Sequence, residues 1–247
     1  MFKKLLLPII LLPALISSCN NDDESTNSNV VTTNISFTAL NGNQTYLKSD
    51  TVNFFDTYKL RFDDLEYFVS NITLIDVDGK STYLDSVQFI DHSKTDNSFQ
   101  VNVEKGTYSK ITFNLGLTED LNQSDPTKRP VDHPLSTKEN MFWSWGSQYR
   151  FVRLQGNFGE IPTADLTETF AWHPGTPDLL RKVELDLEEK EILSHSEINI
   201  ELQVTDILNK IETVDVKNNP NWHGSPSNVS VAHKIVDNFV ASLSYKK

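Results

Sequence analysis

The chain has 247 residues, a formal net charge of −12 at pH 7, and a single cysteine. A chain this acidic lacks the clustered Lys and Arg that bind a phosphate backbone, so we expect no nucleic-acid partner. One cysteine also excludes an internal disulfide and a cluster of thiolate metal ligands.

The first residues predict export and membrane anchoring. Two lysines precede an apolar run over residues 5–16, which is too short to span a bilayer and is typical of a secretory signal. The residues before Cys19 resemble a bacterial lipobox, in which a cysteine carries the lipid. We therefore expect residues 1–18 to be a lipoprotein signal peptide and Cys19 to be lipidated. This predicts an outer-membrane lipoprotein on the periplasmic or the cell-surface face.

The mature chain is expected to begin with a tether and continue as one domain. Residues 19–30 are mostly polar and acidic and contain no aromatic side chain, which predicts a disordered tether. No break in composition divides residues 31–247, so we expect a single domain there.

Apolar side chains recur near every second position in many short segments, which is the period of a half-buried strand. The segments cover residues 34–40, 58–77, 85–91, 98–103, 109–117, 148–158, 181–188 and 198–204. Turn residues at Asp78-Gly79 and Lys105-Gly106 predict tight hairpins between strands. The pattern predicts an all-β fold, most simply an antiparallel β-sandwich.

Two segments depart from this pattern. Residues 121–140 are rich in polar residues and proline, which predicts a long loop, and loops of that length tend to be functional or mobile. Near the C-terminus, apolar residues spaced by four at Val231, Ile235, Phe239 and Leu243 predict a short helix packed on the sheet. The alternative for that segment is a terminal strand.

Sequence motifs of common enzymes are absent. The chain has no glycine-rich phosphate loop, no Gly-x-Ser-x-Gly motif and no His-Glu-x-x-His motif. Adjacent carboxylates such as Asp63 and Asp64 point to opposite faces of a strand. A carboxylate pair from separated strands stays open, but no pair stands out. We therefore do not expect an enzyme.

The histidines and tryptophans offer the remaining chemistry. His133 and His173 are each followed by proline, and tryptophans lie nearby in the segment 141–151 and at Trp172. Imidazoles in an apolar shell without thiolates suit copper better than hard cations. Core aromatics and ordinary turn histidines are the competing interpretation, and the residues alone leave both open.

Three longer motifs add a resemblance. The runs "GTYSKITFNLGLTEDLNQSD", "HPLSTKENMFWSWGSQYRFVRLQGNF" and "FAWHPG" resemble the MbnP-like family, and the similarity extends over about residues 35–203. The resemblance implies a β-sandwich that binds one copper ion through two histidines and a kynurenine, which forms when a tryptophan is oxidised. It also implies a dihaem cytochrome c peroxidase-like partner enzyme.

Carried onto this chain, the resemblance assigns His133 and His173 as metal ligands. The tryptophan to be oxidised would be Trp143, Trp145 or Trp172. His223 and His233, nearer the C-terminus, are secondary candidates that could complete or replace the site. The expected function is a copper-binding lipoprotein that captures or stores the metal, and the alternative is a surface module that binds carbohydrate or peptide without metal.

Overall fold

The computed structural model describes residues 29–144, 146, 148–162 and 165–247. The predicted signal peptide, the predicted lipidation site Cys19, most of the predicted tether and Trp145 therefore lie outside the described residues. In the part of the chain that is described, no helix is long and apolar enough to cross a membrane.

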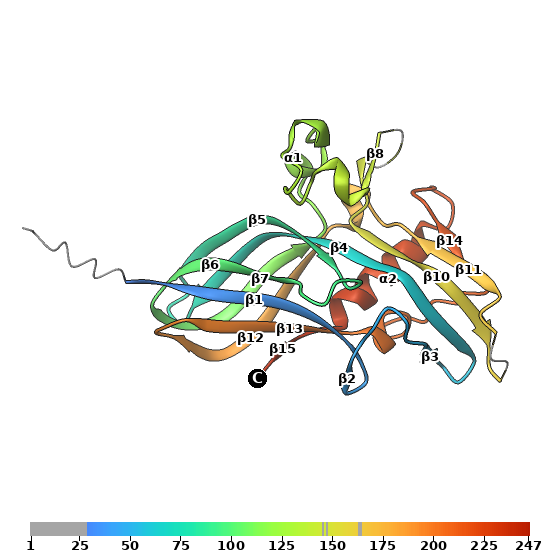
Figure 1. The fold of residues 1–247 in the computed structure, drawn as a ribbon, viewed down its shortest axis with the longest axis horizontal. Helices are drawn as coiled ribbons and strands as arrows, with labels where there is room; N and C mark the ends of the chain where they lie inside the picture. Colours follow the sequence, from blue (N-terminus) through green and yellow to red (C-terminus); the bar gives the residue numbers. More distant parts are fainter. Residues whose placement is uncertain (1–28, 145, 147, 163–164) are drawn as a thin grey trace, which may run out of the picture.

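The fold is built almost entirely from strands (Figure 1). The strands are β1 (Val30–Asn41), β2 (Gln44–Thr45), β3 (Val52–Phe54), β4 (Tyr58–Asp76), β5 (Ser81–Asp91), β6 (Ser98–Glu104), β7 (Gly106–Leu115), β8 (Phe142–Trp143), β9 (Gln148–Tyr149), β10 (Val152–Glu160), β11 (Glu168–Trp172), β12 (Arg181–Ile192), β13 (Ser196–Gln203), β14 (Asn221–Trp222) and β15 (Leu243–Lys246). The helices are α1 (Glu119–Asn122), α2 (Val229–Ala241) and four short 3₁₀ turns, η1 (Pro126–Lys128), η2 (Thr137–Glu139), η3 (Pro177–Leu179) and η4 (Val204–Asp206).

Two sheets form the sandwich. One has the order β15-β13-β1-β2, with β6 also paired to β1, and the other has the order β12-β7-β4-β10-β11-β14, with β3 and β5 paired to β4. The predicted all-β sandwich and the C-terminal helix are confirmed. The pairing is mixed, however, because β1 lies parallel to β13 and β11 lies parallel to β14.

Aromatic side chains join the layers. Phe37 of β1 packs edge-on against Tyr67 of β4 and Phe113 of β7, with ring centroids 6.3 and 5.6 Å apart. Tyr67 in turn contacts Phe239 of α2 at 4.8 Å. All four side chains are buried, as the two-residue period in the strands and the four-residue period in the helix predict.

One of the two predicted hairpins is confirmed. Gly79, at φ +85°, turns β4 into its antiparallel partner β5, a backbone angle that glycine adopts at little cost. The hairpin predicted at Lys105-Gly106 was wrong. There β6 pairs with β1 and β7 pairs with β4 and β12, so the chain crosses from one sheet to the other.

The partner of β4 changes at Phe68. Before this residue β4 pairs with β10, and after it β4 pairs with β7. Phe68 donates its backbone N–H to the carbonyl of Phe151 and accepts a hydrogen bond from the backbone N–H of Gly116. The segment that connects β7 to β10 leaves the sheet at this point, and Figure 1 shows its elements α1 and β8 projecting beyond the sheet.

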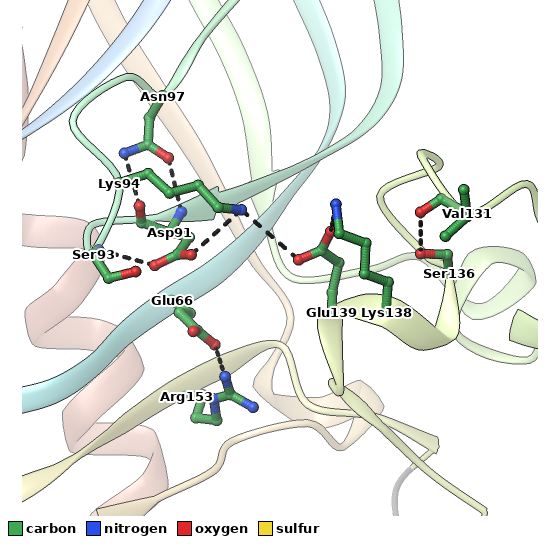
Figure 2. A network of polar contacts seen from close by, with 10 residues as sticks. All are labelled: Glu66, Asp91, Ser93, Lys94, Asn97, Val131, Ser136, Lys138, Glu139 and Arg153. Carbon is green, nitrogen blue, oxygen red and sulfur yellow. Dashed lines mark hydrogen bonds and ion pairs between the residues drawn. The ribbon is translucent and has the colours of Figure 1, made fainter.

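Polar contacts attach this projecting segment to the rest of the fold (Figure 2). The ammonium of Lys94 lies 3.4 Å from a carboxylate oxygen of Asp91 and 3.9 Å from one of Glu139. At the end of the long loop, the guanidinium of Arg153 in β10 donates to the carbonyl of Asn140 at 3.2 Å. The predicted long loop at residues 121–140 is thus present, but it is packed against the sheet at several points.

A buried histidine next to this core makes stability depend on pH. His92 is 8% exposed, its Nε2 lies 3.2 Å from the hydroxyl of Tyr67, and burial lowers its pKa to about 4. The unfolded chain binds a proton near pH 6.5, so His92 contributes its full stability above that pH and loses it as the pH falls towards 4.

We expect the stability contributed by His92 to fall by about 3 kcal/mol between pH 7 and pH 4. Urea unfolding at both pH values measures this loss, and a His92→Gln variant, which does not titrate, should lose correspondingly less stability than the wild type. An equal loss in the two proteins would contradict the assignment.

Candidate metal site

Two parallel strands bring two histidines together. β11 and β14 pair with Trp172 opposite Trp222, and each strand ends at its tryptophan. The next residue in each case is a histidine, His173 or His223, and the backbone N–H of His173 donates to the carbonyl of Trp222 at 2.9 Å. The two histidines therefore leave the sheet side by side.

The tryptophans fix the direction in which the histidines point. Trp172 and Trp222 are buried, and their indole N–H groups donate to the carbonyls of Asn219 and Ser225 at 2.8 and 3.0 Å. Successive side chains of a strand point to opposite faces, so the residue after each buried tryptophan points the other way.

The rings of the two histidines meet under Trp143. Nδ1 of His173 lies 2.9 Å from Nδ1 of His223, and the ring centroids are 4.6 Å apart. The ring of Trp143, at the end of β8, lies 5.2 Å from the ring of His173 and 5.8 Å from that of His223. These three residues, the His173/His223/Trp143 cluster, come from three separate strand ends.

A glutamine relay sets the tautomer of His173. The side-chain amide Nε2 of Gln155 donates to a carboxylate oxygen of Asp64 at 2.6 Å, which turns its carbonyl oxygen Oε1 towards Nε2 of His173 at 3.0 Å. A carbonyl oxygen only accepts, so Nε2 of His173 carries the proton and Nδ1 keeps its lone pair. In metal-binding histidines, a hydrogen bond to the other ring nitrogen plays this orienting role.

Both histidines are held in the neutral form. Burial lowers the pKa of His173 to about 3, and the nearby charge of Arg150 adds to this. The same two causes lower the pKa of His223. Neutral imidazole is the form that binds a metal. Because Nδ1 of His173 keeps its lone pair, the 2.9 Å contact is a hydrogen bond donated by Nδ1 of His223, and this proton must move to Nε2 of His223 for both Nδ1 atoms to act as ligands.

The spacing of the two nitrogens fits a shared metal ion. Two nitrogens bound to one metal at about 2.0 Å each are separated by about 2.8 to 4 Å, depending on the angle between the bonds. The Nδ1 atoms of His173 and His223, at 2.9 Å, fall within this interval and need at most a small rotation. Among the described residues, no group of three or more His, Cys, Asp or Glu side chains could hold a metal, so a further ligand would have to be of another type.

The sequence-predicted ligand His133 lies in a turn of the projecting segment. Its Nδ1 accepts a hydrogen bond from the backbone N–H of Leu135 at 3.0 Å, and its carbonyl accepts one from Ser136 at 2.9 Å. In the ranges that the structure describes, no hydrogen bond or ring contact joins it to His173 or His223. Its role as a ligand stays a prediction.

The other candidates are placed apart from the cluster or outside the described residues. His233 lies on α2, where Nδ1 is 2.9 Å from a guanidinium nitrogen of Arg181 and Nε2 is 3.3 Å from a carboxylate oxygen of Asp178. Trp172 packs into the core against Phe170, with ring centroids 4.7 Å apart. Of the three tryptophans proposed for oxidation, Trp143 is the described one that contacts both histidines of the cluster.

A repeated dipeptide in the sequence marks His223. The chain contains Trp-His twice, in "FAWHPG" and in "NPNWHG", each at the end of a short extended segment. Equivalent positions at the ends of two parallel neighbouring strands lie side by side, and this repetition points to the histidine pair.

The fold and the cluster define a β-sandwich with a paired-histidine site capped by tryptophan. The family model of MbnP matches residues 28–227, and the chain belongs to the MbnP family. Among solved structures, it is similar to MbnP from Methylosinus trichosporium, with a TM-score of 0.50 and 15% sequence identity over 80% of this chain and 82% of that chain. That likeness supports the fold, and no curated protein matches the chain significantly.

Proposed function

We propose that the chain captures or stores a single copper ion between Nδ1 of His173 and Nδ1 of His223. The observation that carries the proposal is the pair of facing nitrogens 2.9 Å apart, on a buried His173 and an exposed His223, both held in the neutral form. Membership of the MbnP family supports a copper-associated and non-catalytic role. Two imidazoles without a carboxylate or thiolate match the ligand preference of copper better than that of magnesium or calcium.

We further propose that Trp143 is the tryptophan oxidised to kynurenine. Its contact with both histidines supports this assignment, whereas the indole of Trp172 is committed to the core and to the carbonyl of Asn219. A kynurenine at position 143 would add an aromatic amine and a carbonyl oxygen next to the two imidazoles. A dihaem cytochrome c peroxidase-like enzyme is the partner we propose for the oxidation.

The proposed location follows from the N-terminus. Lipidation of Cys19 would anchor the domain to the outer membrane, on the periplasmic or the cell-surface face, through the tether predicted over residues 19–30. Incorporation of labelled palmitate into the wild type but not into a Cys19→Ala variant tests this anchor.

The alternative, a carbohydrate- or peptide-binding module, gains little support from the tryptophans. A sugar platform needs tryptophans stacked on an exposed face, but Trp172 is 0% and Trp222 is 3% exposed. Trp143 is half-buried beneath the guanidinium of Arg150. Copper binding is therefore the function that the described residues favour.

The experiment that tests the proposed function combines metal analysis with peptide mass spectrometry. The mature domain is purified after co-expression with the partner enzyme, alongside a Trp143→Phe variant. We expect one copper ion per wild-type chain and a kynurenine mass at position 143, with weaker copper binding and no modification in the variant. Absence of copper from the wild type would refute the proposal, and modification at Trp145 or Trp172 would move the assignment.

A further inference from the structure

Arg150 is a buried cation that has no carboxylate partner among the described residues. The residue is 5% exposed, its guanidinium lies over the ring of Trp143, and its backbone N–H donates to the carbonyl of Met141 at 2.8 Å. Within the described residues, its Nε and Nη2 atoms have no hydrogen-bond partner and no ion pair neutralises it. Burial lowers its pKa to about 10, so the guanidinium is still charged at neutral pH.

A nearby arginine, Arg153, has the carboxylate partners that a buried arginine usually has. Arg153 forms an ion pair with Glu66, and its Nε lies 3.7 Å from a carboxylate oxygen of Asp64 (Figure 2 shows the contact with Glu66). Asp64 and Glu66, whose charges also act on Arg150, are thus in contact with Arg153. These contacts leave the charge of Arg150 without a direct counter-ion. A buried charge without a counter-ion costs free energy.

The charge of Arg150 acts on the histidine pair. Its guanidinium carbon lies 4.7 Å from the ring of Trp143, and that ring contacts both His173 and His223. A cation over an indole face is attracted by the ring, which compensates part of the burial cost and keeps the charge in place. The same charge disfavours the protonated form of both imidazoles.

We propose that Arg150 is a specificity-determining residue that makes the His173/His223 pair select a monovalent metal ion over dications. The proposal rests on the proposed function, because it takes the histidine pair as the metal site. It assigns to Arg150 a role in choosing the charge of the metal, without direct coordination.

The physical reason is that Coulomb repulsion scales with the charge of the metal. A fixed positive charge near the pair repels a dication twice as strongly as a monocation at the same position. Two imidazoles alone also bind zinc and other dications well, so the ligands by themselves give little selectivity. No described acidic side chain joins the cluster to offset the repulsion. Copper(I) is the monovalent ion that matches these ligands.

The test compares affinities for Cu(I) and Zn(II) in the full mature chain, with Cu(I) buffered by a chromophoric chelator under anaerobic conditions. In Arg150→Gln, we expect the ratio of Cu(I) to Zn(II) affinity to fall by about tenfold or more. In Arg150→Lys, which keeps the charge, the ratio should stay near that of the wild type. Thermal unfolding of each variant verifies that it is folded.

Two results would overturn the inference. One is an unchanged ratio in a folded Arg150→Gln variant, and the other is wild-type protein in which modest excess Zn(II) displaces Cu(I) from the pair. The second measurement uses the wild type alone and so decides the matter even if Arg150→Gln fails to fold. If the wild type binds Cu(I) through His173 and His223 but gives either of these two results, the inference alone is refuted. If the wild type binds no copper, the proposed function and the inference are both refuted.

Discussion

Replacing either His173 or His223 with alanine is expected to weaken copper binding by more than about 100-fold, whereas His133→Ala should leave it nearly unchanged. Each of the two variants removes one of the facing Nδ1 atoms, and changes that merely disturb the surroundings of a metal ligand already cost about 10- to 100-fold. Equilibrium dialysis against buffered Cu(I) measures the affinity of all three variants.

His133→Ala is the matched control for this experiment because it tests the pair assigned from the sequence. His233→Ala is a second control, since His233 is engaged by Arg181 and Asp178 on another part of the surface. If His133→Ala lost copper while His223→Ala retained it, the His133–His173 pair would be the site. The present assignment of His223 would then be wrong.

Much of the fold was predictable because its signals are local. The two-residue apolar period located the long strands, and the four-residue period of Val231, Ile235 and Phe239 located α2. Pairing between distant segments leaves no such local mark. The parallel contacts of β1 with β13 and of β11 with β14 were therefore not predicted, and the glycine at position 106 was misread as a hairpin signal.

The candidate site was only half predictable for the same reason. His173 stands out because proline follows it and tryptophan precedes it, but the position of its neighbour depends on the pairing of β11 with β14. His133 has an equally conspicuous proline, yet its ring accepts the backbone N–H of Leu135, which is an ordinary turn contact. The sequence indicated the type of candidate ligand and one candidate, His173, while the register of two short strands brings His223 next to it.

The glycine next to the orienting Gln155 is where a small substitution should do most damage to the fold. At Gly156 of β10, an added Cβ would lie 1.9 Å from the carbonyl oxygen of Arg61 and 3.0 Å from the backbone nitrogen of Asp63. The pairing of β10 with β4 shifts register at this point, so the two backbones approach closely. Both obstructing atoms belong to the central strand β4 and cannot move aside as a side chain would.

We expect Gly156→Ala to lower the free energy of unfolding by about 3 kcal/mol or more, because β10 must move away from β4 to admit the methyl group. Gly106→Ala is the matched control, since a Cβ there would meet only the ring of Tyr108 at an ordinary 3.8 Å. Urea unfolding at pH 7 measures both variants, and equal midpoints for Gly156→Ala and wild type would show that the close approach does not exist.

Movement of β10 also displaces Gln155 from Nε2 of His173. The fraction of Gly156→Ala that remains folded should therefore bind copper more weakly than the wild type, whereas Gly106→Ala should bind it normally.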